Sequence, residues 1–175
     1  LKILNNYLKM KSIQNNKIFI DSAEYIYRVE HLTLEGTCSL DHGPKIVNIK
    51  NLYADKYPVT NEQFLYFITK TGYKPEDPQR FLALKTNKSN HPVVCVSQND
   101  AIQYAKWNGG RLPTDEEWQY IAAGPNYLDW PWGDKFDPSV CNHDHNALTP
   151  VNSHKRGASW CGCEDLIGNA WEWTS

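Results

Sequence analysis

Residues 165–173 of this 175-residue chain read Asp165-Leu166-Ile167-Gly168-Asn169-Ala170-Trp171-Glu172-Trp173. Two carboxylates flank a glycine-asparagine turn, and two tryptophans close the stretch. On an extended backbone, groups on alternate residues face one side, here the carbonyls of Gly168 and Ala170 and the carboxylate of Glu172. Asp165 can reach the same point from the preceding turn. Because calcium binds such mixtures of carboxylate and carbonyl oxygens, the stretch predicts a calcium site.

The composition is typical of a globular protein with one domain. Apolar residues make up 41% of the chain and charged residues 22%. The net charge of −2 gives no electrostatic case for binding nucleic acid or an anionic membrane. No apolar run approaches the roughly 20 residues of a membrane span. We therefore predict a single domain over residues 1–175, in which residues 1–17 are a tail or lead-in.

The ends of the chain leave the cellular compartment open. The first residue is Leu rather than Met, and the motif at residues 165–173 lies almost at the last residue, so we expect both termini to be incomplete. A cytoplasmic location is favoured, although a secreted origin is not excluded. The sequence does not indicate an oligomeric state.

Local patterns predict strands first and helices second. Residues 17–20, 24–34 and 45–53 are rich in Ile, Val, Tyr and Leu, which favours strands. Three short helices follow, with N-cap residues at Thr60, Ser97 and Thr114. Their expected apolar positions are Phe64, Phe67 and Ile68, then Ala101, Tyr104 and Ala105, then Trp118, Ile121 and Ala122. Residues 125–162 show no period and predict a long ordered loop that aromatic side chains hold in place.

The cysteines are odd in number and irregularly spaced: Cys38, Cys95, Cys141, Cys161 and Cys163. This spacing does not predict a disulfide framework. His143 and His145 lie near the C-x-C pair in the sequence, which makes a zinc site conceivable. Free thiols, some of them buried as small apolar side chains, are the favoured interpretation because no ligand spacing matches a known zinc pattern.

Five segments in order resemble a known family. They contain Pro58-Val59-Thr60-Asn61-Glu62-Gln63-Phe64, His91-Pro92-Val93-Val94, Gly110-Arg111-Leu112-Pro113-Thr114, Pro131-Trp132-Gly133-Asp134, and Gly168-Asn169-Ala170-Trp171-Glu172-Trp173. Together they resemble the sulfatase-modifying-factor domain, the family of the formylglycine-generating enzyme, from about Ile18 to Ser175. The resemblance implies an α+β fold of the C-type lectin-like kind. It also implies a small twisted sheet, a few short helices, extensive ordered loops and an incomplete C-terminal part.

The resemblance also implies site residues. The ligands of a structural calcium in this family correspond to Asp165, Gly168, Ala170 and Glu172. A second calcium site of the family begins at an asparagine that matches Asn142. Trp171 matches a tryptophan of the substrate pocket, with ordinary core packing as the other interpretation.

The catalytic residues stay unknown. The generating enzymes oxidise a substrate cysteine with dioxygen at copper(I), which two cysteines bind downstream of the tryptophan motif and therefore beyond Ser175. None of the five cysteines of this chain matches those positions. Copper(I) is accordingly expected only in a full-length protein.

Three functions are compatible with the resemblance. The first is part of a formylglycine-generating oxidoreductase that acts on a protein or peptide such as an unfolded sulfatase segment. The second is a non-catalytic member of the fold that binds a ligand or serves as a scaffold. The third is a domain of an iron-dependent sulfoxide synthase.

Overall fold

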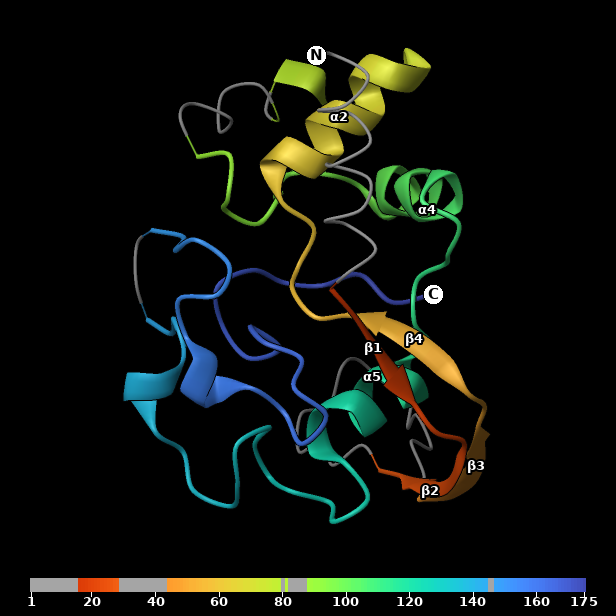
Figure 1. Cartoon of the computed structure of the whole chain (residues 1–175), viewed down its shortest axis with the longest axis vertical. Helices are drawn as coiled ribbons and strands as arrows, with labels where there is room; N and C mark the ends of the chain where they lie inside the picture. The colour runs from red at the N-terminus through yellow and green to blue at the C-terminus, as the bar shows by residue number, and fades with distance from the viewer. Residues whose placement is uncertain (1–15, 29–43, 80, 82–87, 145–146) are drawn as a thin grey trace, which may run out of the picture.

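The computed structural model describes residues 16–28, 44–79, 81, 88–144 and 147–175 (Figure 1). Its strands are β1 (Lys17–Ile20), β2 (Ala23–Tyr27), β3 (Lys45–Ile49) and β4 (Leu52–Asp55). Its helices are α2 (Asn61–Thr71), α4 (Gln98–Trp107) and α5 (Asp115–Ala123), followed by the 3₁₀ turns η1 (Pro138–Val140) and η2 (Lys155–Gly157). The architecture is α+β, as predicted. No helix in these ranges is long and apolar enough to cross a bilayer.

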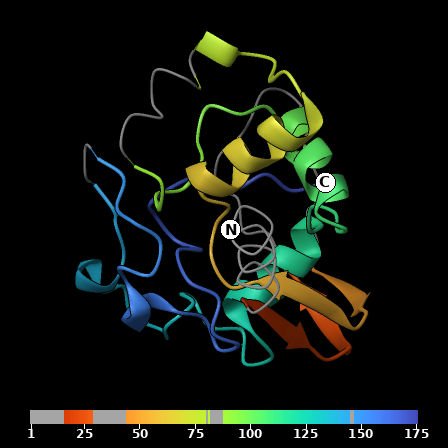
Figure 2. The same ribbon diagram turned by 45° about the horizontal axis from the view of Figure 1, so that its top comes forward.

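The strands and α5 lie at one end of the molecule, and α2 and α4 lie at the other (Figures 1 and 2). β1 pairs antiparallel with β4, with Ile20 opposite Leu52. β2 pairs antiparallel with β3, with Ala23 opposite Ile49. The second ladder continues the register of the first. The segments 17–27 and 45–55 therefore run antiparallel to each other along both ladders, and we call this bent pair of segments the ribbon.

The bend in the ribbon corrects one of the predicted strands. The segment 45–53 is not one strand, because it is interrupted at Lys50 and Asn51. The Oδ1 atom of Asn51 accepts a hydrogen bond of 2.6 Å from the backbone N–H of Ser22. This bond lies at the bend between the two ladders. The strand at 17–20 is confirmed. The strand predicted at 24–34 is confirmed as far as Tyr27, and its residues from 29 onward lie outside the described ranges.

Each of the three helices begins at a complete capping box. The N-cap hydroxyl accepts the N–H three residues on, and the side chain of that residue accepts the N-cap N–H. The pairs are Thr60 with Gln63, Ser97 with Asp100, and Thr114 with Glu117. Helices of 9 to 11 residues are marginal on their own, so packing of their apolar faces must hold them in place.

Two apolar clusters provide that packing. The first lies between the ribbon and α5 and consists of Ile20, Tyr25, Ile49, Tyr120, Ile121 and Cys163. The second joins α2 and α4 and consists of Phe64, Phe67, Phe81 and Tyr104. The predicted apolar positions are therefore largely confirmed. Ala101, Ala105 and Trp118 are exceptions, because they are only half-buried and line a cavity.

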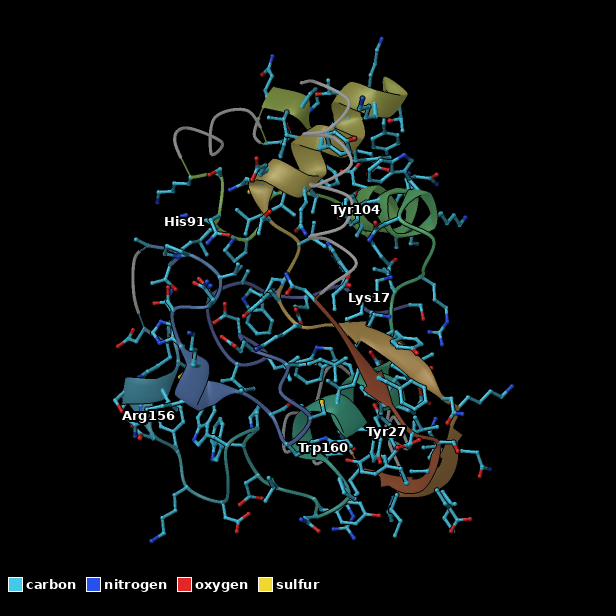
Figure 3. All side chains as sticks on the ribbon, in the orientation of Figure 1. Lys17, Tyr27, His91, Tyr104, Arg156 and Trp160 are labelled. Carbon is cyan, nitrogen blue, oxygen red and sulfur yellow. The ribbon has the colours of Figure 1, made fainter. Side chains whose placement is uncertain are left out.

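Aromatic side chains hold the irregular segment 125–162 in place, as predicted. Trp160 lies beside α5 (Figure 3), and its Nε1–H donates a hydrogen bond of 2.9 Å to the backbone oxygen of Tyr120. The two rings meet edge to face, with centroids 5.3 Å apart. Farther along, Trp130 and Trp132 stack with centroids 5.9 Å apart. The indole of Trp160 also closes over Gly124, the residue that ends α5.

Gly124→Ala is expected to destabilise the fold by at least about 2 kcal/mol more than Gly109→Ala. Both glycines have a positive φ, 68° and 77°, but only a methyl group at Gly124 would lie 2.5 Å from an atom of Trp160. Space around Gly109 is open within 4 Å. Urea denaturation of the two variants measures the difference, and equal losses would contradict the packing of Trp160 on this turn.

The Arg111–Glu117 pair makes a pH-dependent contribution to stability. Two guanidinium nitrogens of Arg111 lie 2.6 Å from the carboxylate oxygens of Glu117, which also accepts the N–H of Thr114. The hydrogen bond from Arg111 is the main reason that the pKa of Glu117 lies below its ordinary value of 4.5. A lowered pKa stabilises the fold fully above the unfolded-state pKa, and this stabilisation is lost as the pH falls below that value.

Glu117→Gln is therefore expected to lower the free energy of unfolding by about 2 kcal/mol at pH 7. The loss should shrink as the pH falls from 5 toward 3, because protonation removes the same charge in the unsubstituted chain. Denaturant unfolding across this pH range provides the measurement. Glu24→Gln, at an exposed position of β2, is the matched control and should change little. A pH-independent loss in Glu117→Gln would argue against a charged pair.

Candidate functional site

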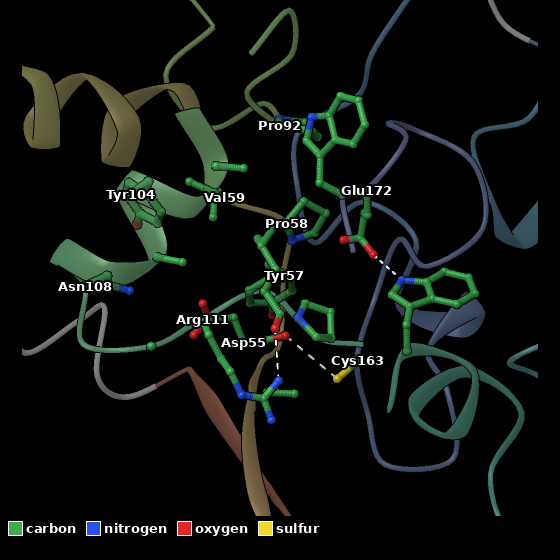
Figure 4. A pocket seen from close by; sticks show the side chains of 18 of the residues that line it. Asp55, Tyr57, Pro58, Val59, Pro92, Tyr104, Asn108, Arg111, Cys163 and Glu172 are labelled. Carbon is green, nitrogen blue, oxygen red and sulfur yellow. Dashed lines mark hydrogen bonds between the residues drawn. The ribbon is translucent and has the colours of Figure 1, made fainter. Parts of the chain in front are cut away.

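A cavity of about 980 Å³ lies between the two apolar clusters (Figure 4). β4, α5, the C-terminal part of α4, the segment 92–96 and the terminal segment 170–173 line it. Its wall is largely apolar, and Asp55, Arg111 and Glu172 are among the charged residues that line it. A cavity of this size and character is typical of binding sites for small molecules or for a few residues of a peptide.

Hydrogen bonds with two other segments hold the terminal segment in place along this cavity. The Nε1–H of Trp118 in α5 donates to Oε2 of Glu172 at 2.7 Å (Figure 4). The Nε1–H of Trp173 donates to the backbone oxygen of Val96 at 3.0 Å. Trp171, which directly precedes these two anchored residues, lines the cavity with a relative exposure of 103%. The interpretation of Trp171 as ordinary core is therefore wrong, while its contact with a substrate stays a prediction.

The Gly168–Asn169 bend that precedes this segment depends on the side chain of Asn169. Its Oδ1 accepts from Nδ2 of Asn142 at 3.1 Å and from the N–H of Thr149 at 3.0 Å. Its Nδ2 donates to the backbone oxygen of Thr149 at 3.2 Å and to Oδ2 of Asp165 at 3.1 Å. A Cβ atom on Gly168 would lie 2.5 Å from the backbone oxygen of Asn142, so this close approach requires glycine.

The structure brings predicted ligands of both calcium sites together at this bend, Asp165 and Gly168 of the first site and Asn142 of the second. Asn142 and Asp165 both contact Asn169, and Gly168 packs on the backbone of Asn142. The Nδ2 of Asn142 also donates to Ala147, and this fixes the orientation of the amide. Its Oδ1 is then buried without a hydrogen-bond partner. An orphaned buried carbonyl oxygen fits the ligand preference of calcium.

The other predicted ligands lie farther along the terminal segment. The N–H of Ala170 donates to the backbone oxygen of Gly168 at 2.7 Å, which makes a tight turn. Glu172 lines the cavity and is bonded to Trp118. Within the described ranges, no three His, Cys, Asp or Glu side chains cluster around a common point. The predicted calcium site combines only two carboxylates with carbonyl oxygens, so its occupancy stays a prediction.

The two carboxylates are electrostatically strained. Burial raises the pKa of Asp165, against the opposing hydrogen bond from Asn169. Glu172 has an exposed surface, but it lies in the cavity, where nearby protein atoms displace part of the water around its carboxylate. This desolvation, with a smaller contribution from the charge of Asp165, raises the pKa of Glu172 to about 7 despite the hydrogen bond from Trp118. A bound divalent cation would offset both penalties.

The described cysteines Cys95, Cys141, Cys161 and Cys163 carry free thiols, and the predicted burial is confirmed for Cys141 and Cys163. Cys38 and His145 lie outside the described ranges. His143 packs its ring against Phe136, with centroids 5.0 Å apart.

Sequence reasoning misses two contacts around the site. The helical spacing of Trp118 predicts a core position, although an indole N–H needs a polar partner, which Glu172 provides. The sulfur atoms of Cys161 and Cys163 lie 3.8 Å apart, and the C-x-C spacing with a central glycine is the available signal.

Known proteins resemble this chain in sequence. Residues 14–175 match the family described as the sulfatase-modifying factor enzyme 1-like domain. The chain is 28% identical over 193 residues to the formylglycine-generating enzyme of Mycobacterium tuberculosis, covering 74% of this chain and 64% of that protein. It is 29% identical over 184 residues to the inactive C-alpha-formylglycine-generating enzyme 2 of Bos taurus, covering 74% and 61%. The chain thus spans less than two thirds of the length of these relatives.

A solved structure supports the same fold. The structure of PvdO from Pseudomonas aeruginosa has a TM-score of 0.66 to this chain and covers 91% of it and 69% of its own chain. At 20% sequence identity, this likeness concerns the fold alone. It confirms the predicted fold class. With the family match over residues 14–175, the chain belongs to the sulfatase-modifying factor enzyme 1-like domain family.

Proposed function

We propose that this chain is the calcium-stabilised, substrate-binding part of an oxidoreductase of the formylglycine-generating type. Its substrate would be a cysteine-containing peptide segment of a sulfatase, which the whole enzyme converts to formylglycine. The observation that carries the proposal is Trp171, which is fully exposed on the wall of the cavity and directly precedes two anchored residues.

The surroundings of Trp171 favour binding of a peptide. An exposed indole leaves a large apolar surface in water, and tryptophans in such positions are frequent energetic centres of binding sites. Glu172 and Trp173 fix the backbone on the C-terminal side of Trp171. The ring is therefore presented to the cavity at a small entropic cost.

Copper(I) belongs to this proposal only for a longer protein. Copper(I) would supply the reducing equivalents with which dioxygen is activated. Among the described residues, the thiols that line the cavity are Cys95 and Cys163, which come from different segments. The sulfur of Cys163 lies 3.8 Å from the backbone oxygen of Asp55 (Figure 4). These residues do not match the predicted copper site, so we assign them no step in the oxidation of the substrate.

A non-catalytic, peptide-binding protein of the same fold is the second candidate. The bovine relative named as inactive matches the same share of this chain as the mycobacterial enzyme. Both candidates require peptide binding in the cavity, but only the first requires chemistry. Incubating the longer gene product with copper(I), dioxygen and a sulfatase peptide separates them. Mass spectrometry should detect formylglycine, and an unmodified peptide that still binds would favour the second candidate.

Calcium is expected to raise the melting temperature of the chain, and excess chelator should lower it. Saturation at about a hundred times the Kd contributes about 2.7 kcal/mol of stability. Glu172→Gln removes a ligand charge while its side-chain oxygen can still accept from Trp118, so calcium should bind about tenfold more weakly or worse. Asp134→Ala, on an exposed loop, is the control and should keep the response. Identical melting curves in calcium and in chelator would exclude the site.

Trp171→Ala is expected to weaken binding of a cysteine-containing sulfatase peptide at least about tenfold, or about 1.4 kcal/mol. The free energy of unfolding should change by less than about 0.5 kcal/mol, because the side chain is fully exposed. Fluorescence anisotropy of a labelled peptide measures the Kd. Phe136→Ala removes an aromatic ring that is 42% exposed and does not line the cavity, and it should leave the Kd unchanged. Undiminished binding by Trp171→Ala would remove the observation on which the proposal rests.

A further inference from the structure

Cys161 and Cys163 lie on a tight turn that directs their sulfur atoms toward each other. The N–H of Gly162 donates a hydrogen bond of 2.8 Å to the backbone oxygen of Ser159. The N–H of Ser159 donates a second one, also of 2.8 Å, to the backbone oxygen of Cys163. Gly162 has a φ of 97°, which an L-residue with a side chain rarely adopts. The two sulfur atoms are 3.8 Å apart as a result.

The pair sits between two regular elements. The sulfur of Cys161 lies 3.7 Å from the backbone oxygen of Ile121 in α5. The sulfur of Cys163 lies 3.8 Å from the backbone oxygen of Asp55 at the end of β4. Cys163 is buried in the first apolar cluster, whereas Cys161 is half-buried. The two thiols therefore differ in access, with Cys161 the one that a solute can reach first.

The environment of Cys161 favours its ionised form. The hydrogen bond from Cys163, supported by the hydroxyl of Ser159 at 3.3 Å, lowers the pKa of Cys161 to about 6 against the opposing effect of burial. A thiol with this pKa is largely thiolate at pH 7, and the thiolate is the nucleophile in thiol–disulfide exchange. Neither this environment nor the pairing of the two sulfurs has a part in the proposed function.

We propose that Cys161 and Cys163 form a redox centre that closes to an intramolecular disulfide by exchange with a small-molecule disulfide. The Cys161 thiolate attacks one sulfur of the external disulfide, forms a mixed disulfide and releases one thiolate. The Cys163 thiol then attacks the sulfur of Cys161, and its proton leaves with the second released thiol. Two protein thiols are oxidised to one disulfide, and one external disulfide is reduced to two thiols.

The closed form should be easy to reduce. The sulfur atoms must move from 3.8 Å to about 2.05 Å, in a ring that contains a single intervening residue. Such a ring departs from relaxed disulfide geometry, and strained disulfides have the more oxidising potentials. We therefore infer a reversible centre rather than a permanent structural cross-link.

Glutathione is the probe for the test. The full chain is equilibrated with oxidised glutathione, acid-quenched, alkylated and mapped by mass spectrometry. One disulfide is expected within the peptide that contains residues 161–163, with two fewer free thiols, and excess reduced glutathione should restore both. The alkylation rate of Cys161 should level off above about pH 7, because its thiolate fraction is then nearly complete.

Substitutions locate the chemistry. Cys161→Ser should abolish the reaction, and Cys163→Ser should stop it at one glutathione on Cys161. Cys95→Ser and Cys141→Ser are the matched controls and should still close the disulfide. Circular dichroism checks the fold of each variant, and the map of the unsubstituted chain decides the question if a variant fails to fold. Alkylation of both Cys161 and Cys163 after prolonged exposure to oxidised glutathione would overturn the proposal, as would a persistent mixed disulfide in the unsubstituted chain.

Discussion

The irregular half of the molecule depends on the hydrogen bonds of one amide, that of Asn169. Its oxygen and nitrogen both make two bonds, and these join the segments 142–149 and 165–169, between which no strand ladder runs in the described residues. Each bond contributes about 1 kcal/mol net, but any partner left unsatisfied in this buried place would cost more. The φ of 57° at Asn169 lies in the left-handed region that asparagine tolerates better than most residues. One residue type thus meets both the hydrogen-bond and the backbone requirement.

The terminal segment beyond this bend joins the two halves of the fold. Glu172 is bonded to Trp118 on α5, which packs with the ribbon, and Trp173 is bonded to Val96, which packs against the cluster of α2 and α4. The segment therefore spans the cavity and connects the two apolar clusters that form its walls. A peptide on Trp171 and a cation at Glu172 would act on the same few residues. Their binding free energies should consequently be coupled, by the general linkage between ligands that stabilise one conformation.

The features that the sequence predicts correctly are those with local causes. The helix starts at Thr60, Ser97 and Thr114 could be predicted because a capping box lies within four consecutive residues. The break in the segment 45–53 could not, because it depends on a contact between Ser22 and a residue 29 positions away. The lectin-like architecture came from the family resemblance rather than from periodicity, since short strands and long loops leave no regular pattern to read.

In the candidate site as well, residue types could be predicted from the sequence, but contacts between distant residues could not. Asp165 and Glu172 stand out by residue type, but the bond from Trp118 to Glu172 spans 54 positions and leaves no sequence period. The C-x-C spacing is ambiguous in the sequence because the distance between its sulfurs depends on the positive φ of Gly162. The residue after Cys163 is Glu164. Its N–H donates to the backbone oxygen of Lys56, and its carboxylate pairs with the ammonium group of Lys56. The next residue is Asp165, so closing the disulfide would pull on the chain that leads into the Asn169 bend. The thiol pair and the predicted calcium site are thus parts of one short, continuous and tightly bonded segment.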